Sequence, residues 1–350
     1  MKTSGLRALV VLAALCAAPA GAKTREKSLI EKFVNGKTED RIRLAPALGY
    51  VKDKKAVEEL LWAFDIRNGS PRESSAIVDA LGQAGDPRAA VALAAAEDYI
   101  RSTALQMGEL PAQLQVLHGK ILEAMGKVGG DRAVALLEEA VNDKDPRVVE
   151  EAVRSLGRLQ VKDAVPALQQ LASQGGDMTQ AVFEALAAIG DKSASATLEQ
   201  GLASPDKFVN VEAAYALARL GRKDMVERLE APLKGGAGSG KVGILSAYYL
   251  VRLDRASGLD HLVALMNKPD SGLSVLAADA LGKADNPRAV LPLTEQLKSD
   301  DADLRLAVAR GLGLLGGIRS VIALKKLAQD PNPGVRAAAQ SALVGLGEID

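Results

Sequence analysis

Histidine and cysteine, two residue types that often perform chemistry, are scarce in this chain of 350 residues. The two histidines, His118 and His261, are far apart in the sequence, and the single cysteine, Cys16, is near the N-terminus. The sequence contains no Gly-x-Ser-x-Gly turn between a strand and a helix and no Asp-rich calcium loop. We therefore predict that the protein is not an enzyme, holds no metal ion and needs no cofactor.

Residues 235–242 have the spacing of a phosphate-binding loop. In such loops backbone amides surround the phosphates, a lysine contacts them, and a following Ser or Thr holds magnesium. Here Lys241 is present, but Val242 stands in the place of the Ser or Thr. A true loop also follows a buried strand, whereas 225–233 and 242–253 are predicted to be helices. We interpret the segment as a connection between helices, with weak anion binding at the second helix as the alternative.

The overall composition excludes further classes of protein. Lys and Arg together number 44, and Asp and Glu together also number 44, so the net charge is zero. Nucleic-acid binding is therefore not expected. Hydrophobic residues make up 48% and aromatic residues only 3% of the chain. This composition is typical of a folded globular or repeat protein rather than a disordered chain.

The first 22 residues have the features of a secretory signal. Lys2 and Arg7 precede an apolar stretch from Ala8 to Ala18, and the small residues Ala20 and Ala22 follow. The apolar stretch is shorter than the ~20 residues that a membrane span needs, so no integral membrane span is predicted. We expect cleavage after residue 22 and an N-terminal segment, 23–38, ahead of the main domain.

The position of Cys16 bears on a lipid anchor. Bacterial lipoproteins carry a small residue immediately before the modified cysteine, whereas Leu15 precedes Cys16 here. Removal of residues 1–22 also removes Cys16, so the mature chain would contain no thiol. We predict an exported protein, periplasmic or extracellular, in preference to a lipoprotein.

The rest of the chain shows a helix, turn, helix pattern. Asp145 suits a helix cap and Pro146 a first helical turn, while Gly157 lies near the predicted helix end, where a left-handed residue often closes a helix. Apolar residues recur at three- and four-residue intervals in both halves of the unit. Asp53, Asp86 and Asp191 fall at turns between helices and are predicted to be caps or turn formers.

The same unit recurs about every 31 residues. The residues that follow the last leucine of each first helix, or Met125 in the third, are Gly49, Gly82, Gly126, Gly157, Ala187, Ala218, Val251, Gly282, Gly313 and Val344. Their separations are 33, 44, 31, 30, 31, 33, 31, 31 and 31. Such regularity indicates a stack of repeats. The long interval indicates an insertion around 94–113, interpreted as an enlarged connection between helices.

The repeated motifs resemble HEAT repeats, in particular the short HEAT-like class that also occurs in bilin lyases. Residues 280–290, ALGKADNPRAV, nearly restate residues 80–90, ALGQAGDPRAA, and the resemblance covers residues 39–350. It implies an all-α fold, an α-solenoid of about ten helical hairpins, each stabilised by its neighbours.

The resemblance also implies a ladder of Arg–Asp contacts between repeats. The family's arginine in the first helix matches Arg41, Arg305 and Arg336. Ser74, His118, Val149 and Thr179 depart from it. The ladder is therefore expected to be interrupted in the middle of the chain.

Enzymes with this kind of repeat have features that this sequence lacks. Deoxyhypusine hydroxylases of the HEAT-like class use paired His-Glu dipeptides, whereas Gly119 follows His118 and Leu262 follows His261. HEAT-like DNA glycosylases have a basic, aromatic groove, which a neutral chain with one tryptophan does not provide. A bilin-lyase-like enzyme or enzyme-associated subunit, with a site built from loops, stays open as the alternative function.

We expect instead a scaffold that binds a protein or peptide. The resemblance implies that second helices line the concave side, where equivalent residues of successive repeats form a row. The predicted partner-binding residues of this row are Glu138, Glu139, Gln169, Glu199, Glu230, Lys325 and Lys326. Because the row is acidic or amide-bearing in mid-chain, a partner with a basic segment is the hypothesis, with a merely solvated face as the alternative.

Overall fold

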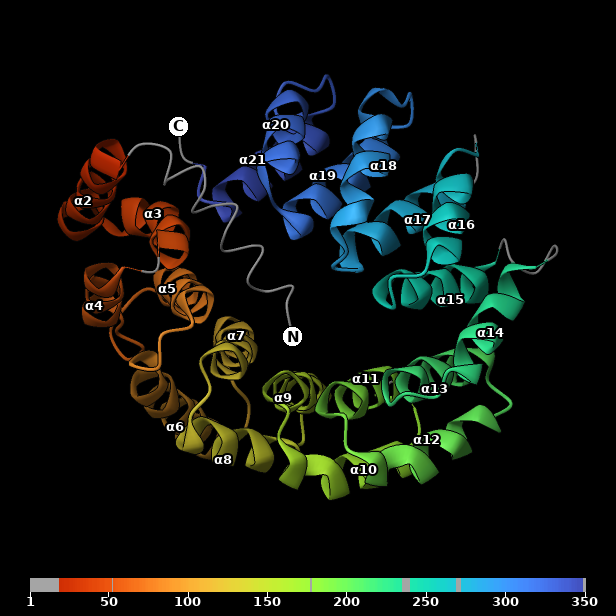
Figure 1. The fold of residues 1–350 in the computed structure, drawn as a ribbon. Helices are drawn as coiled ribbons and strands as arrows, with labels where there is room; N and C mark the ends of the chain where they lie inside the picture. Colours follow the sequence, from red (N-terminus) through yellow and green to blue (C-terminus); the bar gives the residue numbers. More distant parts are fainter. Residues whose placement is uncertain (1–18, 52, 177, 235–239, 269–271, 349–350) are drawn as a thin grey trace. The chain divides into compact units, whose positions relative to one another are not determined.

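A computed structural model describes residues 19–348 of the chain, except residues 52, 177, 235–239 and 269–271. The described residues form twenty α-helices, α2 to α21, joined by short turns and 3₁₀ helices, with no strand among them (Figure 1). The predicted all-α solenoid of helical hairpins is confirmed.

After α2 (Pro19–Asn35) the helices alternate between two layers. The first helices of the hairpins are α3 (Thr38–Val51), α5 (Pro71–Ala84), α7 (Ala112–Val128), α9 (Pro146–Leu159), α11 (Thr179–Ile189), α13 (Lys207–Arg219), α15 (Lys241–Arg252), α17 (Gly272–Lys283), α19 (Ala302–Leu315) and α21 (Pro333–Gly345). The second helices are α4 (Lys54–Ala63), α6 (Ala89–Met107), α8 (Asp131–Ala140), α10 (Val165–Gln174), α12 (Ser195–Leu202), α14 (Asp224–Glu230), α16 (Ala256–Met266), α18 (Val290–Glu295) and α20 (Ile318–Leu327).

Helix α9 shows how the repeat begins and ends. Asp145 caps it by accepting a hydrogen bond from the backbone N–H of Arg147 at 2.9 Å, and Pro146 is its first residue, both as predicted. Gly157, however, does not close the helix. The helix continues to Leu159, and Gln160 adopts the left-handed conformation with φ 58°.

The described chain divides into two compact units, residues 19–197 and residues from 198 onward. Within each unit the first helices form one layer and the second helices the other, and the apolar core lies between them. Each unit bends, and Figure 1 shows the first helices on the inner side of the bend. The prediction that second helices line the concave side is therefore wrong.

A seam of small residues explains why the first helices take the inner side. The aligned glycines face small residues of the next first helix: Gly49 and Ala80, Gly82 and Ala124, Gly126 and Ser155, Gly157 and Ala185, Gly282 and Gly311, Gly313 and Ala342. A Cβ on Gly157 would lie 2.7 Å from the Cα of Ala185, so the backbones approach closely. The layer with the closer spacing becomes the shorter, inner side of a bent stack.

The insertion around 94–113 forms helix rather than a long connection. Helix α6 runs for 19 residues to Met107, and only residues 108–111 join it to α7. Alanines and other helix formers fill this stretch, so the helix continues until Gly108, at φ 78°, ends it. The enlarged connection that we expected is therefore a lengthened second helix.

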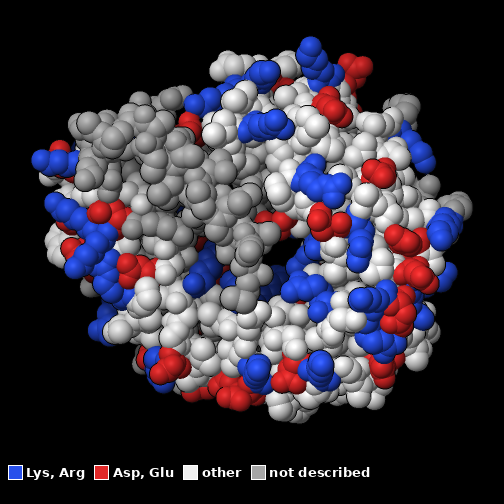
Figure 2. All heavy atoms as spheres, viewed as in Figure 1, with Lys and Arg blue, Asp and Glu red and all other residues white. Residues whose placement is uncertain are grey.

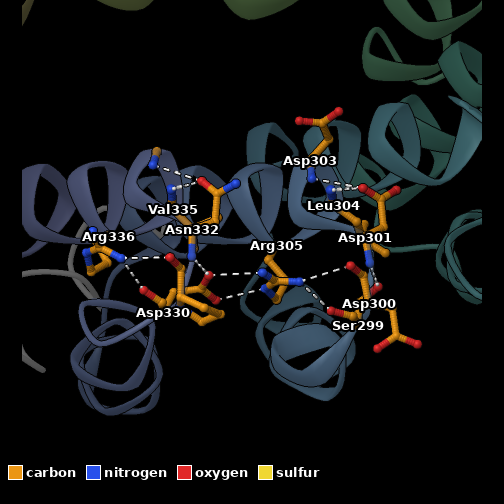
Figure 3. Close-up of polar contacts among 12 residues, drawn as sticks. Ser299, Asp300, Asp301, Asp303, Leu304, Arg305, Asp330, Asn332, Val335 and Arg336 are labelled. Atoms are coloured by element: carbon orange, nitrogen blue, oxygen red, sulfur yellow. Dashed lines mark hydrogen bonds and ion pairs between the residues drawn. The ribbon is translucent and has the colours of Figure 1, made fainter.

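The Arg–Asp ladder is present at the C-terminal end. Arg305 donates to both carboxylate oxygens of Asp330, at 2.8 and 2.9 Å, and to the carbonyl of Ser299 at 2.6 Å (Figure 3). Arg336 donates to the carbonyl of Asp330 at 2.7 Å. The bonds to Ser299 and to the carbonyl of Asp330 join α19 and α21 to the turns that precede them, and the Arg305–Asp330 pair joins α19 to the turn before the next first helix, α21.

In several repeats without the arginine, another polar side chain joins the first helix to the turn before it. Ser74 and Thr179 donate to the carbonyls of Asp65 and Gly176 in the preceding turns. Asn210, at the equivalent place in α13, donates to the carbonyls of Gly201 and Ser204. The interruption of the ladder therefore removes its charges from these repeats but keeps the tie between helix and turn.

The predicted signal sequence lies mostly outside the described residues, since only residues 19–22 of it are described, in the first turn of α2. The prediction for Cys16 lies outside them as well. Within the described part of the chain, no helix is long and apolar enough to cross a membrane.

Candidate functional site

The predicted row of partner-binding residues lies on the second helices, away from the inner side of the bend. Glu138 and Glu139 are in α8 and Gln169 is in α10 of the first unit. Glu199, Glu230 and the two lysines, Lys325 and Lys326, are in α12, α14 and α20 of the second unit.

Most side chains of the row bond within their own unit. In the first unit, Glu139 pairs with Arg101 of α6, and the amide of Gln169 donates to Ser193 and Thr197, both at 3.1 Å. In the second unit, Glu199 accepts from Arg222 at 2.8 Å and Glu230 from Ser257 at 2.7 Å, while Lys325 pairs with Glu348 at 2.7 Å. The row thus joins neighbouring repeats.

The inner layer of the first unit carries charges that neutralise one another. Lys120 of α7 pairs with Asp79 of α5, and Arg154 pairs with Glu150 within α9. Burial acts to raise the pKa of Glu123, but the hydrogen bond from Lys127 and nearby positive charges outweigh it, so this pKa lies below its ordinary value. This layer has little net charge to offer a partner.

Burial and the nearby charge of Glu123 raise the pKa of Glu151. The two carboxylates lie on neighbouring first helices, α7 and α9. Arg158 of α9 donates to the backbone carbonyl of Glu123 at 3.3 Å, which keeps a positive charge beside both. This arrangement belongs to the packing of the two helices.

The inner layer of the second unit differs, because an aromatic pair interrupts the small-residue seam between α13 and α15. Tyr249 occupies the place that Ala185 or Gly311 takes elsewhere and stacks on Tyr215, with ring centroids 4.1 Å apart and an interplanar angle of 13°. Both tyrosines are fully buried. The rings fill a space that small residues would leave open.

Arginines cover this aromatic pair. The guanidinium of Arg252 lies 5.0 Å from the ring centroid of Tyr215 and 5.5 Å from that of Tyr248, and it donates to the Tyr248 hydroxyl at 3.2 Å. Arg219 donates to the Tyr215 hydroxyl at 3.2 Å. Glu212 of α13 contributes a buried carboxylate to this helix layer.

Exposed cations and leucines continue from these arginines. We define the inner strip as seven side chains of α13, α15, α17 and α19 that are exposed or half-buried, namely Arg219, Tyr248, Arg252, Leu276, Lys283, Arg310 and Leu314. Leu276 is 37% and Leu314 is 54% exposed. Asp279 of α17 is half-buried beside the strip.

Sequence reasoning missed the inner strip, although a signal for it was present. Arg219, Arg252 and Lys283 each directly follow an aligned residue of the repeat, as do Lys127 and Arg158 in the first unit. The sequence showed that a cation recurs directly after the aligned position. It did not show that this position lies on the inner layer of helices. On the face seen in Figure 2, acidic and basic side chains intermingle over much of the surface.

The phosphate-loop lookalike borders a pocket of about 490 Å³. Lys207, Arg228 and Lys241 surround it, and Phe208 and Val211 contribute apolar walls. The helix α14 and the 3₁₀ helix Ala231–Leu233 precede residue 234, so no strand leads into the segment. Residues 235–239 themselves lie outside the described chain.

The two histidines are in different units. His118 of α7 is buried, with its Nε2 2.9 Å from Oε1 of Glu97 in α6, while His261 is in α16. His118 occupies the aligned position of the ladder arginine, and its contact with Glu97 joins α7 to α6. Among the residues that the structure describes, no three His, Cys, Asp or Glu side chains gather in a metal-binding arrangement.

Comparison with known proteins agrees with this architecture. The family model for HEAT repeats matches residues 115–186 and 259–344. These two stretches of the chain are recognised as HEAT repeats. No curated protein matches it significantly.

Several solved structures are similar to this chain. Human deoxyhypusine hydroxylase in complex with glycerol is 21% identical, with 75% of this chain and 100% of that chain covered and a TM-score of 0.40. The complex of CpcE and CpcF of phycocyanin lyase from Nostoc sp. PCC7120 is 20% identical, with coverages of 92% and 94% and a TM-score of 0.34. An engineered protein is 19% identical, with coverages of 92% and 98% and a TM-score of 0.35.

Proposed function

We propose that the protein is an exported, non-catalytic HEAT scaffold that binds a segment of a partner protein on the inner strip. The second-helix row, our first hypothesis for the binding surface, is a weaker candidate because its polar side chains already bond to neighbouring repeats. Export rests on the sequence of residues 1–22, which has the pattern of a secretory signal.

The observation that carries this proposal is the combination of exposed leucines and cations on one layer. Leu276 and Leu314 offer apolar area, and Lys283 and Arg310 are exposed close to them in the repeat pattern. Recognition surfaces commonly combine apolar anchors with charged groups that orient the partner. Arg252, held against two tyrosine rings, adds a cation whose position is fixed before binding.

Co-purification from the native cell envelope tests the proposal. A tagged chain should recover a partner, and Leu276→Asp/Leu314→Asp should reduce the recovery at least about tenfold because buried carboxylates are costly at an interface. The matched control is Leu291→Asp/Ile322→Asp, which changes residues of α18 and α20 that are at least as exposed and should keep the recovery. Equal recovery by all three proteins would contradict the proposal.

A further inference from the structure

We infer that the partner segment on the inner strip is an extended acidic peptide with apolar residues between its carboxylates. This inference rests on the proposed function and names the chemistry of the partner. The sequence suggested a basic partner segment for the second-helix row. The inner strip lies on the first helices and is rich in cations, so the partner segment inferred here is acidic.

The charges of the strip support an acidic partner. Arg219, Arg252, Lys283 and Arg310 provide four cations, against the carboxylates of the half-buried Asp279, the exposed Asp303 and the buried Glu212. Among the described residues, Lys283 and Arg310 form no ion pair, and the side-chain hydrogen bond of Arg219 goes to a neutral phenol. By contrast, Arg305 and Arg288 of the same unit are paired with carboxylates. Lys283 and Arg310 thus carry positive charge that no carboxylate among the described residues pairs with.

The spacing of the helices sets the pattern of the peptide. Adjacent packed helices are about 8–10 Å apart, and an extended chain advances about 3.3 Å per residue, so one helix corresponds to about three residues. A carboxylate at every third position would meet a cation on successive first helices. Apolar residues in between would reach Leu276 and Leu314. A polyphosphate chain has no group for these leucines, which favours a peptide over a nucleic acid.

Fluorescence anisotropy with a synthetic probe tests this inference. The probe is a labelled peptide of about five Glu-Ser-Leu repeats, and its first control is the peptide with glutamine in place of glutamate. The chain should bind the glutamate peptide, and binding should weaken as salt shortens the Debye length from about 30 Å at 0.01 M to about 8 Å at 0.15 M. The glutamine peptide should bind at least about tenfold more weakly.

Charge reversal locates the binding. The double variant Lys283→Glu/Arg310→Glu should bind the glutamate peptide at least about tenfold more weakly, because two attractions become repulsions. The control Lys298→Glu/Lys326→Glu changes the net charge equally on exposed residues of the second-helix layer. It should stay within about twofold of the unaltered chain. Thermal melting of both variants should show the unaltered helical fold, since all four residues are exposed.

Three results would overturn the inference. The first is equal binding of the glutamate peptide by both double variants, and the second is absent binding by a folded chain. The third is tighter binding of a single-stranded DNA of equal charge than of the peptide, which would point to a polyphosphate ligand. If the native partner still depends on Leu276 and Leu314 but not on Lys283 and Arg310, the scaffold function stands and the acidic partner is wrong.

Discussion

At the scale of the residue, Asp330 has the most specific role in the C-terminal ladder. Its carboxylate accepts two hydrogen bonds from Arg305, and the two side chains are only 5% and 10% exposed. Asp330→Ala should therefore lower the free energy of unfolding by about 3 kcal/mol, because it leaves a buried guanidinium without its carboxylate. Denaturation by urea, followed by circular dichroism, measures this loss.

The control for Asp330 is an exposed pair of the same unit. Arg288 and Asp254 are 52% and 73% exposed, so Arg288→Ala should cost at most about 0.5 kcal/mol. The pH dependence gives a second check. The hydrogen bonds from Arg305 hold the pKa of Asp330 below its ordinary value of 3.8.

The sign of this pKa shift predicts where the stability is lost. The stabilisation by Asp330 is complete well above its unfolded pKa and disappears as the pH falls through the lower folded pKa. The stability difference between the unaltered chain and Asp330→Ala should thus stay constant from about pH 8 to about pH 5 and shrink below about pH 3.8. A difference that persists unchanged in acid would show that the carboxylate charge is not responsible.

At the scale of the element, α7 contains two glycines with opposite roles. A Cβ on Gly126 would lie 2.8 Å from the Cα of Ser155 in α9, whereas a Cβ on Gly119 would meet nothing within 4 Å. Gly126→Ala should destabilise the protein by about 1–3 kcal/mol through overpacking. Gly119→Ala should stabilise it by about 0.5–1 kcal/mol, since alanine favours a helix.

Urea denaturation of the two alanine variants compares the same substitution in one helix. Opposite changes in unfolding free energy are expected. If both variants gain stability, α7 and α9 are not in close contact at Gly126, and the small-residue seam does not set the inner layer.

Much of the element scale was predictable from the sequence. The 31-residue interval between aligned positions predicted the helix pairs, and Asp145 and Pro146 predicted a helix start. Which set of helices forms the inner layer was not predictable in the same way, because it depends on contacts between residues about 30 positions apart. Gly157 illustrates the difficulty: its type suggested a helix end, whereas its contact with Ala185 requires a glycine inside the helix.

The candidate site shares this dependence on packing. The cations after the aligned positions were visible in the sequence, but their layer followed only from the seam. The Tyr215–Tyr249 stack depends on two residues from different repeats, and nothing in either repeat alone predicts it. Sequence patterns therefore located the repeats, while contacts between repeats located the inner strip.

At the scale of the whole molecule, the N-terminus provides a direct prediction. Ala20 and Ala22 are the small residues that a signal peptidase recognises, so the mature chain should begin at Lys23 and carry no lipid. Intact-mass measurement of the protein from its native source tests this expectation. A diacylglycerol-modified chain that begins at Cys16, or a chain that retains residues 1–22, would contradict it.

The central claim is that partners bind the first-helix layer, and site-specific photo-cross-linking in living cells tests it most directly. Leu314 of α19 and Ile322 of α20 are each 54% exposed, one on each layer of the same hairpin. A photoreactive amino acid at position 314 should form a covalent adduct with a partner protein, and the same amino acid at position 322 should not. Adducts from position 322 with none from position 314 would contradict the account.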